Sequence, residues 1–142
     1  MPEGTVLAFD FGEKRVGVAV GEPALGTAHA LPGIAASGDR LLEAVAALVA
    51  EWKPARLVVG MPFATDGAAH GMTRRAERFA RRLEARFRLP VTRVDERYSS
   101  LEAEGRMRDA AGGRRAARAS RDRTLDSGAA CVILEQYLAE AA

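Results

Sequence analysis

The chain has 142 residues, of which 48% are hydrophobic and 28% charged, with a formal net charge of +2 at pH 7. These values are ordinary for a globular protein, and the length suits one domain that buries a real core. No run of 18 apolar residues is present, and the N-terminus lacks the pattern of a signal peptide. We therefore expect a single domain over residues 1–142, no membrane contact and a cytoplasmic location.

Basic residues are concentrated in the second half of the chain. Residues 1–71 carry 5 basic and 8 acidic side chains, whereas residues 72–142 carry 16 basic and 11 acidic ones. Nearly all of the basic residues are arginine, which suits bidentate contacts with phosphate. Genome composition also favours arginine over lysine, so the asymmetry gives only weak support for a nucleic-acid partner.

The first third of the chain predicts three strands. Two apolar runs, from Val6 to Phe11 and from Val16 to Val20, flank a short polar turn and indicate a β-hairpin. The segment from Thr27 to Ile34 supplies a third short strand, interrupted by Pro32.

Helices and strands alternate in the middle of the chain. The pattern predicts a helix that Asp39 caps and Pro54 ends, and then a nearly all-apolar strand from Arg56 to Gly60 of the kind buried in parallel sheets. A second helix is expected from about Gly71 to Phe87, followed by a strand from Pro90 to Val94. Strands in a run, then in alternation with helices, predict an α/β fold in which an antiparallel meander joins parallel crossovers.

The last third predicts two helices around a basic loop. Ser99 with Glu102 has the spacing of a capping box and opens a third helix. Residues 110–123 contain five arginines opposed only by Asp122, so this segment is interpreted as a loop that steers substrate or as a merely solvated one. A final helix is expected from about Thr124, and its Cys131 is interpreted as a small buried hydrophobe.

Three carboxylates occur where a site on a sheet would need them. Asp10 is expected to end the first strand, Glu96 to end the last strand, and Asp126 to lie in the first turns of the final helix. Sites in open α/β sheets form at the carboxyl ends of parallel strands, and Mg²⁺ prefers carboxylate oxygens. Asp95 is an equal alternative to Glu96, because the parity of the strand is not fixed by the sequence.

Each candidate also has a structural explanation. Asp10 can be an ordinary turn residue, Asp126 can serve the helix N-terminus, and Glu96 can pair with a neighbouring arginine. Gly12 permits a positive φ or the close approach of a phosphate, and Gly60 lies where a substrate backbone would pass the strand end.

Taken together, four segments resemble the YqgF family, also called RuvX, a bacterial group within the RNase H-like superfamily that is similar to the RuvC resolvases. The resemblance covers essentially the whole chain. The segments are residues 10–20 (DFGEKRVGVAV), residues 58–62 (VVGMP) with Asp66-Gly67, residues 95–100 (DERYSS), and residues 126–138.

The resemblance implies a fold, a site and an activity. The fold would be RNase H-like, with a mixed five-stranded sheet flanked by helices. The metal ligands and catalytic groups would be Asp10, Glu96 and Asp126, holding Mg²⁺ or Mn²⁺. Substrate contacts implied by the resemblance are Gly12, Lys14, Arg15 and Arg97. The basic loop adds Arg114, Arg115, Arg118 and Arg121 as residues that would steer substrate.

The activity implied is hydrolysis of phosphodiester bonds in structured nucleic acid. The substrate would be the 5′ end of the small-subunit (16S) ribosomal RNA precursor, with resolution of Holliday junctions in branched DNA as the alternative. Ribosomal particles are possible partners, and the oligomeric state would be a monomer or a weak homodimer. Gly21-Glu22, Ala64-Thr65 and Ser99-Ser100 depart from the usual family pattern and leave loop contacts open.

Two other classes remain as alternatives. Kinase-like and actin-like ATPases share the hairpin start, but they need a second related domain and a second phosphate loop, for which 142 residues leave no room. A nucleic-acid-binding module without catalysis is compatible with the same fold. Metal-dependent cleavage that depends on Asp10 would distinguish the enzyme from this module.

Overall fold

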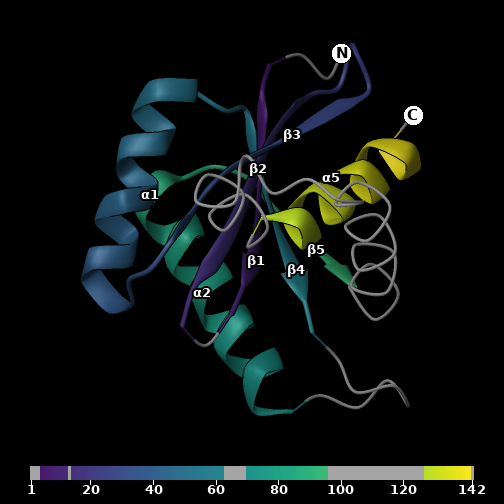
Figure 1. Cartoon of the computed structure of the whole chain (residues 1–142). Coiled ribbons are helices and arrows are strands. Elements are labelled where there is room, and N and C mark those ends of the chain that lie inside the picture. Colours follow the sequence, from purple (N-terminus) through teal and green to yellow (C-terminus); the bar gives the residue numbers. More distant parts are fainter. Residues whose placement is uncertain (1–3, 13, 63–69, 96–126, 142) are drawn as a thin grey trace, which may run out of the picture.

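A mixed five-stranded sheet forms the centre of the molecule, seen in the computed structural model of Figure 1. The structure describes residues 4–12, 14–62, 70–95 and 127–141. Within them, no helix combines the length and apolar character needed to cross a bilayer. The strands, in the spatial order β3-β2-β1-β4-β5, are β1 (Val6–Phe11), β2 (Val16–Glu22), β3 (Thr27–Ile34), β4 (Arg56–Met61) and β5 (Val91–Asp95).

The pairing of the strands confirms the predicted arrangement. β1 pairs with β2 and β2 with β3 in antiparallel register, whereas β1 pairs with β4 and β4 with β5 in parallel register. The meander thus joins the parallel strands through β1, at the centre of the sheet. The carboxyl ends of β1, β4 and β5 consequently meet at one edge.

Helices cover the sheet on both faces (Figure 1). On one face, α1 (Gly38–Trp52) and α2 (Gly71–Phe87) pack against the alternate strand residues that include Leu7, Phe9 and Val59. On the other face, α5 (Gly128–Ala141) contacts all five strands.

The two faces carry side chains of different size. The face under α1 and α2 is built from large residues, and Phe79 of α2 meets Phe9 edge-on at 5.8 Å between ring centroids. The face under α5 presents small residues such as Ala8 and Ala19. At Gly21 an added Cβ would lie 2.9 Å from Leu134 Cδ2, so the absence of a side chain allows α5 to pack closely.

Several predicted boundaries need correction. The first helix begins at Gly38 after Ser37, whose side chain makes no capping bond, so Asp39 lies inside the first turn and is not the cap. α2 has the predicted bounds, and His70 caps it by accepting a hydrogen bond from the Met72 N–H. In the described part of the chain the final helix spans Gly128–Ala141, and its predicted start near Thr124 lies outside the described residues.

Two further predictions concern the last third of the chain. Cys131 packs against the core beneath α5 but is only half-buried, because it lies toward the edge of that contact. The helix predicted after Ser99 and the basic loop 110–123 lie outside the described residues.

Candidate active site at the carboxyl edge of the sheet

Asp10 lies at the centre of this edge, on the face that α5 covers. The alternation of β1 places Val6 and Ala8 in the core beneath α5, and Asp10 follows them on the same face. Its register partners are Gly17 on β2 and Gly60 on β4. Both neighbours are glycines, so neither adjacent strand places a side chain beside this carboxylate. A half-buried carboxylate in this setting suits a hard cation.

The parity of β5 distinguishes two adjacent acidic residues that sequence alone left equivalent. Val94 pairs with Gly60 and packs beneath α5, whereas Asp95 pairs with Met61, which belongs to the core beneath α1 and α2. Asp95 therefore alternates to the face opposite Asp10.

Gly12 is required by the geometry of the turn between β1 and β2. Its N–H donates to the carbonyl oxygen of Arg15 at 3.0 Å, and an added Cβ would lie only 2.5 Å from that same oxygen. The turn itself thus requires glycine here because of the close approach of its own backbone. Lys14 and Arg15 are exposed at this turn, which follows the end of β1 where Asp10 lies.

Ser127, which sequence reasoning missed, ties the start of α5 to the sheet. Its Oγ accepts a hydrogen bond from the Val18 N–H at 2.9 Å and donates one to the Leu31 carbonyl at 2.5 Å. Val18 and Leu31 are register partners beside the irregularity in the β2–β3 pairing, so the hydroxyl bridges two backbone groups of paired strands. The only signal in the sequence was a small hydroxyl residue before a helix, which ordinarily indicates a cap.

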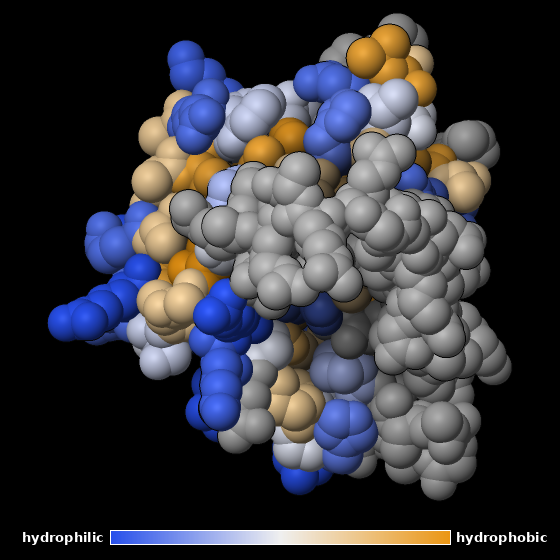
Figure 2. Space-filling model, in the orientation of Figure 1, coloured by the Kyte–Doolittle hydropathy of each residue, from blue (hydrophilic) through white to orange (hydrophobic). Residues whose placement is uncertain are grey.

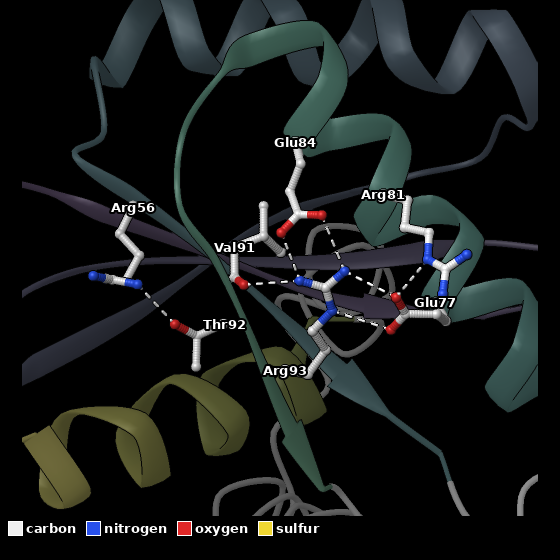
Figure 3. A network of polar contacts seen from close by, with 7 residues as sticks. All are labelled: Arg56, Glu77, Arg81, Glu84, Val91, Thr92 and Arg93. Atoms are coloured by element: carbon white, nitrogen blue, oxygen red, sulfur yellow. Dashed lines mark hydrogen bonds and ion pairs between the residues drawn. The ribbon is translucent and has the colours of Figure 1, made fainter.

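Arg93 of β5 is held by two carboxylates of α2 (Figure 3). Its guanidinium donates to Glu77 at 3.1 and 2.9 Å, to Glu84 at 2.7 and 3.2 Å, and to the Val91 carbonyl at 3.0 Å. These hydrogen bonds lower the pKa of both carboxyl groups and raise the pKa of Arg93. All five donors are used, so Arg93 fastens the edge strand to α2 and has none left for a substrate.

The comparisons with known proteins settle the family. The family model RuvX, described as Holliday junction resolvase, matches residues 4–140. The chain belongs to this family. It is 53% identical to the "Putative pre-16S rRNA nuclease" of Paraburkholderia phytofirmans over 96% of this chain and 88% of that one. The protein of the same name from Burkholderia multivorans is 50% identical over 96% of this chain and 89% of that one.

Solved structures support the fold of this RuvX-family chain. The RuvC of Thermus thermophilus, solved in complex with a Holliday junction substrate, aligns with a TM-score of 0.58 over 96% of this chain and 95% of that one, at 17% identity. A second structure of Thermus thermophilus RuvC aligns with a TM-score of 0.57 over the same shares of the two chains, at 14% identity. The predicted family and RNase H-like fold are thus confirmed, and so is a nuclease at the level of the family.

The described residues hold only part of the predicted site of this RuvX-family chain. Asp10, Gly12, Lys14, Arg15 and Gly60 lie around the ends of β1 and β4. Among the described residues there is no group of three or more potential metal ligands. The other predicted site residues lie outside the described part: Glu96, Arg97, Arg114, Arg115, Arg118, Arg121 and Asp126.

Proposed function

We propose that this chain is a metal-dependent nuclease that hydrolyses phosphodiester bonds in structured nucleic acid, with the 16S ribosomal RNA precursor as its substrate. Relatives about half identical to it along nearly their whole length carry the name of that activity. The observation that supports the chemistry is Asp10, a carboxylate between two glycines at the carboxyl edge of a RuvC-like sheet. The proposed place of action is the cytoplasm.

The proposed metal ligands are Asp10, Glu96 and Asp126. The parity of β5 supports Glu96 over Asp95, since Asp95 alternates away from the face that carries Asp10. The anchored Ser127 supports Asp126, because it fixes the backbone directly next to that residue against the sheet.

Each group would have a distinct task. Bound Mg²⁺ or Mn²⁺ would supply activation of a water molecule and stabilisation of the leaving oxygen. Asp10 would fix the position of the cation above the end of β1. Lys14 and Arg15, exposed at the adjacent turn, would orient the phosphate and offset the charge that develops on it. Gly60 would let the substrate backbone pass close to the strand. The oxygen of water would form a bond to phosphorus as the bond to the leaving oxygen breaks; the water would lose a proton to solvent, and the leaving oxygen would take one up from solvent.

The test uses carboxylate-to-amide variants incubated with precursor ribosomal RNA and Mn²⁺ or Mg²⁺. Asp10→Asn preserves shape but removes the charge, so it should abolish cleavage and keep the fold. Glu96→Gln should also lose at least about a hundredfold in rate, whereas its neighbour Asp95→Asn is the matched control and should stay within a few-fold of the parent.

Different results would lead to different conclusions. An Asp10→Asn protein that cuts like the parent would exclude this mechanism. Strong loss in Asp95→Asn with little loss in Glu96→Gln would reverse the choice of ligand. A parent protein that binds the RNA with either metal and never cuts it would identify a non-catalytic binding module.

Resolution of branched DNA is the second candidate function. The description of the family model and the RuvC fold favour it. A four-way DNA junction incubated beside the RNA precursor separates the two, because a resolvase should cut the junction at paired sites. Symmetric cutting would require two active sites and hence a dimer, whereas processing of an RNA end requires one. Ribosomal particles remain a proposed partner of the RNA-processing activity.

A further inference from the structure

A row of arginines on α2 extends beyond the helix with which it pairs. Arg75, Arg78, Arg82 and Arg86 recur at spacings of three and four residues and so share one side of α2. Arg86 bonds Glu43 of α1 at 2.8 Å, and Arg82 bonds Asp39 of α1 at 3.0 Å. α1 begins at Gly38, so it offers no acidic residue to the next two arginines in the row.

Arg75 and Arg78 have no acidic partner among the described residues. Within the described parts of the chain, Arg78 makes no ion pair, and Arg75 makes only a long contact of 3.7 Å to the Met72 sulfur. The hydrogen bonding of Arg75 and Arg78 contrasts with that of Arg93, whose five N–H donors are all used within the fold. Exposed guanidinium groups without a partner are available to an anion.

Both arginines lie on the rim of an apolar pocket at the active edge of the sheet. The pocket has a volume of about 100 Å³ and lies between the start of α1 and the middle of α2. Phe11 ends β1 one residue after Asp10, and it packs on Phe79 with 5.1 Å between ring centroids. Figure 2 shows hydrophilic and apolar surface side by side over α1 and α2. The lining residues are Phe11, Gly38, Leu41, Leu42, Phe79 and the arginines Arg75, Arg78 and Arg82.

We propose that this pocket binds an unpaired nucleotide of the substrate strand beside the cleavage site, with its phosphate on Arg75 and Arg78 and its base against the apolar floor. The proposal rests on the proposed nuclease function. Basic groups combined with aromatic side chains are the means by which proteins hold single-stranded nucleic acid. A base stacked in a duplex would not reach the floor, so the pocket favours single-stranded over fully paired substrate.

The position of the pocket relative to Asp10 supports a nucleotide as its occupant. Asp10 and Phe11 are adjacent on β1 and lie on opposite faces of the sheet. A strand that passes over the end of β1 would present one phosphate to Asp10 and a neighbouring nucleotide to the pocket. Asp39, which follows Gly38 of the pocket lining, is bonded to Arg82, and no ion pair of Arg75 or Arg78 with it is found among the described residues.

The experiment compares Arg75→Gln/Arg78→Gln with Arg86→Gln/Arg88→Gln, which removes the same charge at the far end of α2. Binding of a fluorescent single-stranded oligoribonucleotide and of a fully paired RNA duplex is titrated in EDTA over a range of salt concentrations. The first variant should bind the single strand on the order of tenfold more weakly, and its salt slope should fall by about 1.4, or roughly 0.7 for each lost contact. The control variant should keep the parent's slope.

Further arms test the base and the source of the phosphate. A strand carrying a photoreactive uridine should crosslink to the α2 or α1 segments that line the pocket. Adenosine monophosphate should compete with the single strand better than inorganic phosphate does.

Several outcomes would overturn the nucleotide site. They are an equal loss of affinity for duplex and single strand, an equal loss of affinity in the control variant, and a parent that does not bind the single strand. If the parent cuts precursor RNA while Arg75→Gln/Arg78→Gln binds like it, this inference fails and the nuclease stands. If the parent binds through these arginines and never cuts, the nuclease fails and the binding site stands.

Discussion

At the scale of single residues, hydrogen bonds at the start of α5 connect parts of the chain that are far apart in sequence. Ser127 is completely buried, and its hydroxyl serves Val18, which lies 109 residues earlier. Val18 and Leu31 lie on paired strands, beside a point where the β2–β3 pairing is irregular. The Ser127 hydroxyl supplies hydrogen bonds to their backbone groups there. A buried backbone group that loses its partner retains the full cost of desolvation.

Replacement of this serine should therefore destabilise the protein strongly. Ser127→Ala leaves the Val18 N–H and the Leu31 carbonyl unpaired and should lower the free energy of unfolding by about 2 kcal/mol. Ser37→Ala is the matched control, because Ser37 is exposed and its side chain makes no capping bond; its effect should stay within about 0.5 kcal/mol. Urea unfolding measures both. Equal effects of the two changes would show that the bridge contributes nothing.

At the scale of elements, Arg93 of β5 with Glu77 and Glu84 of α2 forms a cluster that we call the Arg93 clamp. This clamp makes the attachment of β5 to α2 depend on pH. Its hydrogen bonds hold the pKa values of Glu77 and Glu84 below their usual range. A lowered folded-state pKa contributes stability above the unfolded value, and that stability is lost as pH falls through the folded value. The clamp should therefore weaken as the solution is acidified from about pH 5.

The variant Arg93→Gln should remove this dependence. At pH 7 it should cost about 1 kcal/mol, a modest figure because the carboxylates are partly exposed. Between about pH 5 and pH 3 its stability should fall less steeply than that of the parent, since Glu77 and Glu84 then titrate near their ordinary values. Arg88→Gln, which removes an exposed arginine outside the clamp, should keep the parental pH profile. Parallel profiles for Arg93→Gln and the parent would contradict the prediction.

Much of the fold was predictable from the sequence at this scale. The periodic segments gave α2 its bounds and placed all five strands, because the apolar patterns of helices and strands differ in period. The start of α1 was predicted wrongly, since Asp39 resembles a cap as much as Ser37 does. Contacts across the chain, such as Ser127 between β2 and β3, could not be predicted, because they depend on which strands and helices meet. The face of the sheet on which Asp95 lies needed the register of β5 for the same reason.

At the scale of the whole molecule, the two faces of the sheet carry side chains of different size and charge around the end of β1. Large side chains fill the face beneath α1 and α2, whereas the face beneath α5 carries Asp10 beside Gly17 and Gly60. A cation that binds only the folded state shifts the unfolding equilibrium in proportion to its occupancy.

Metal binding should consequently be visible in the stability of the entire domain. Mn²⁺ at about 100 times its dissociation constant should stabilise the parent by about 2.7 kcal/mol, measured as an increase in Tm. Asp10→Asn should lose this increase, whereas Asp39→Asn, which removes an exposed carboxylate bonded to Arg82, should keep it. An increase of the same size in Asp10→Asn would place the cation elsewhere.

The position of α5 at the end of the described chain has a consequence for folding during synthesis. Among the described residues, all strands precede α5 in sequence, and α5 alone supplies the helical cover of one face. Until its residues leave the ribosome, the apolar surface around Ala8, Ala19 and Val58 lacks this cover, and the β2–β3 ladder lacks the Ser127 bridge. We therefore expect the nascent sheet to keep apolar surface exposed to aggregation until α5 docks on it. Because α5 docks late, we expect a chain truncated before α5 to be translated but to fail to fold.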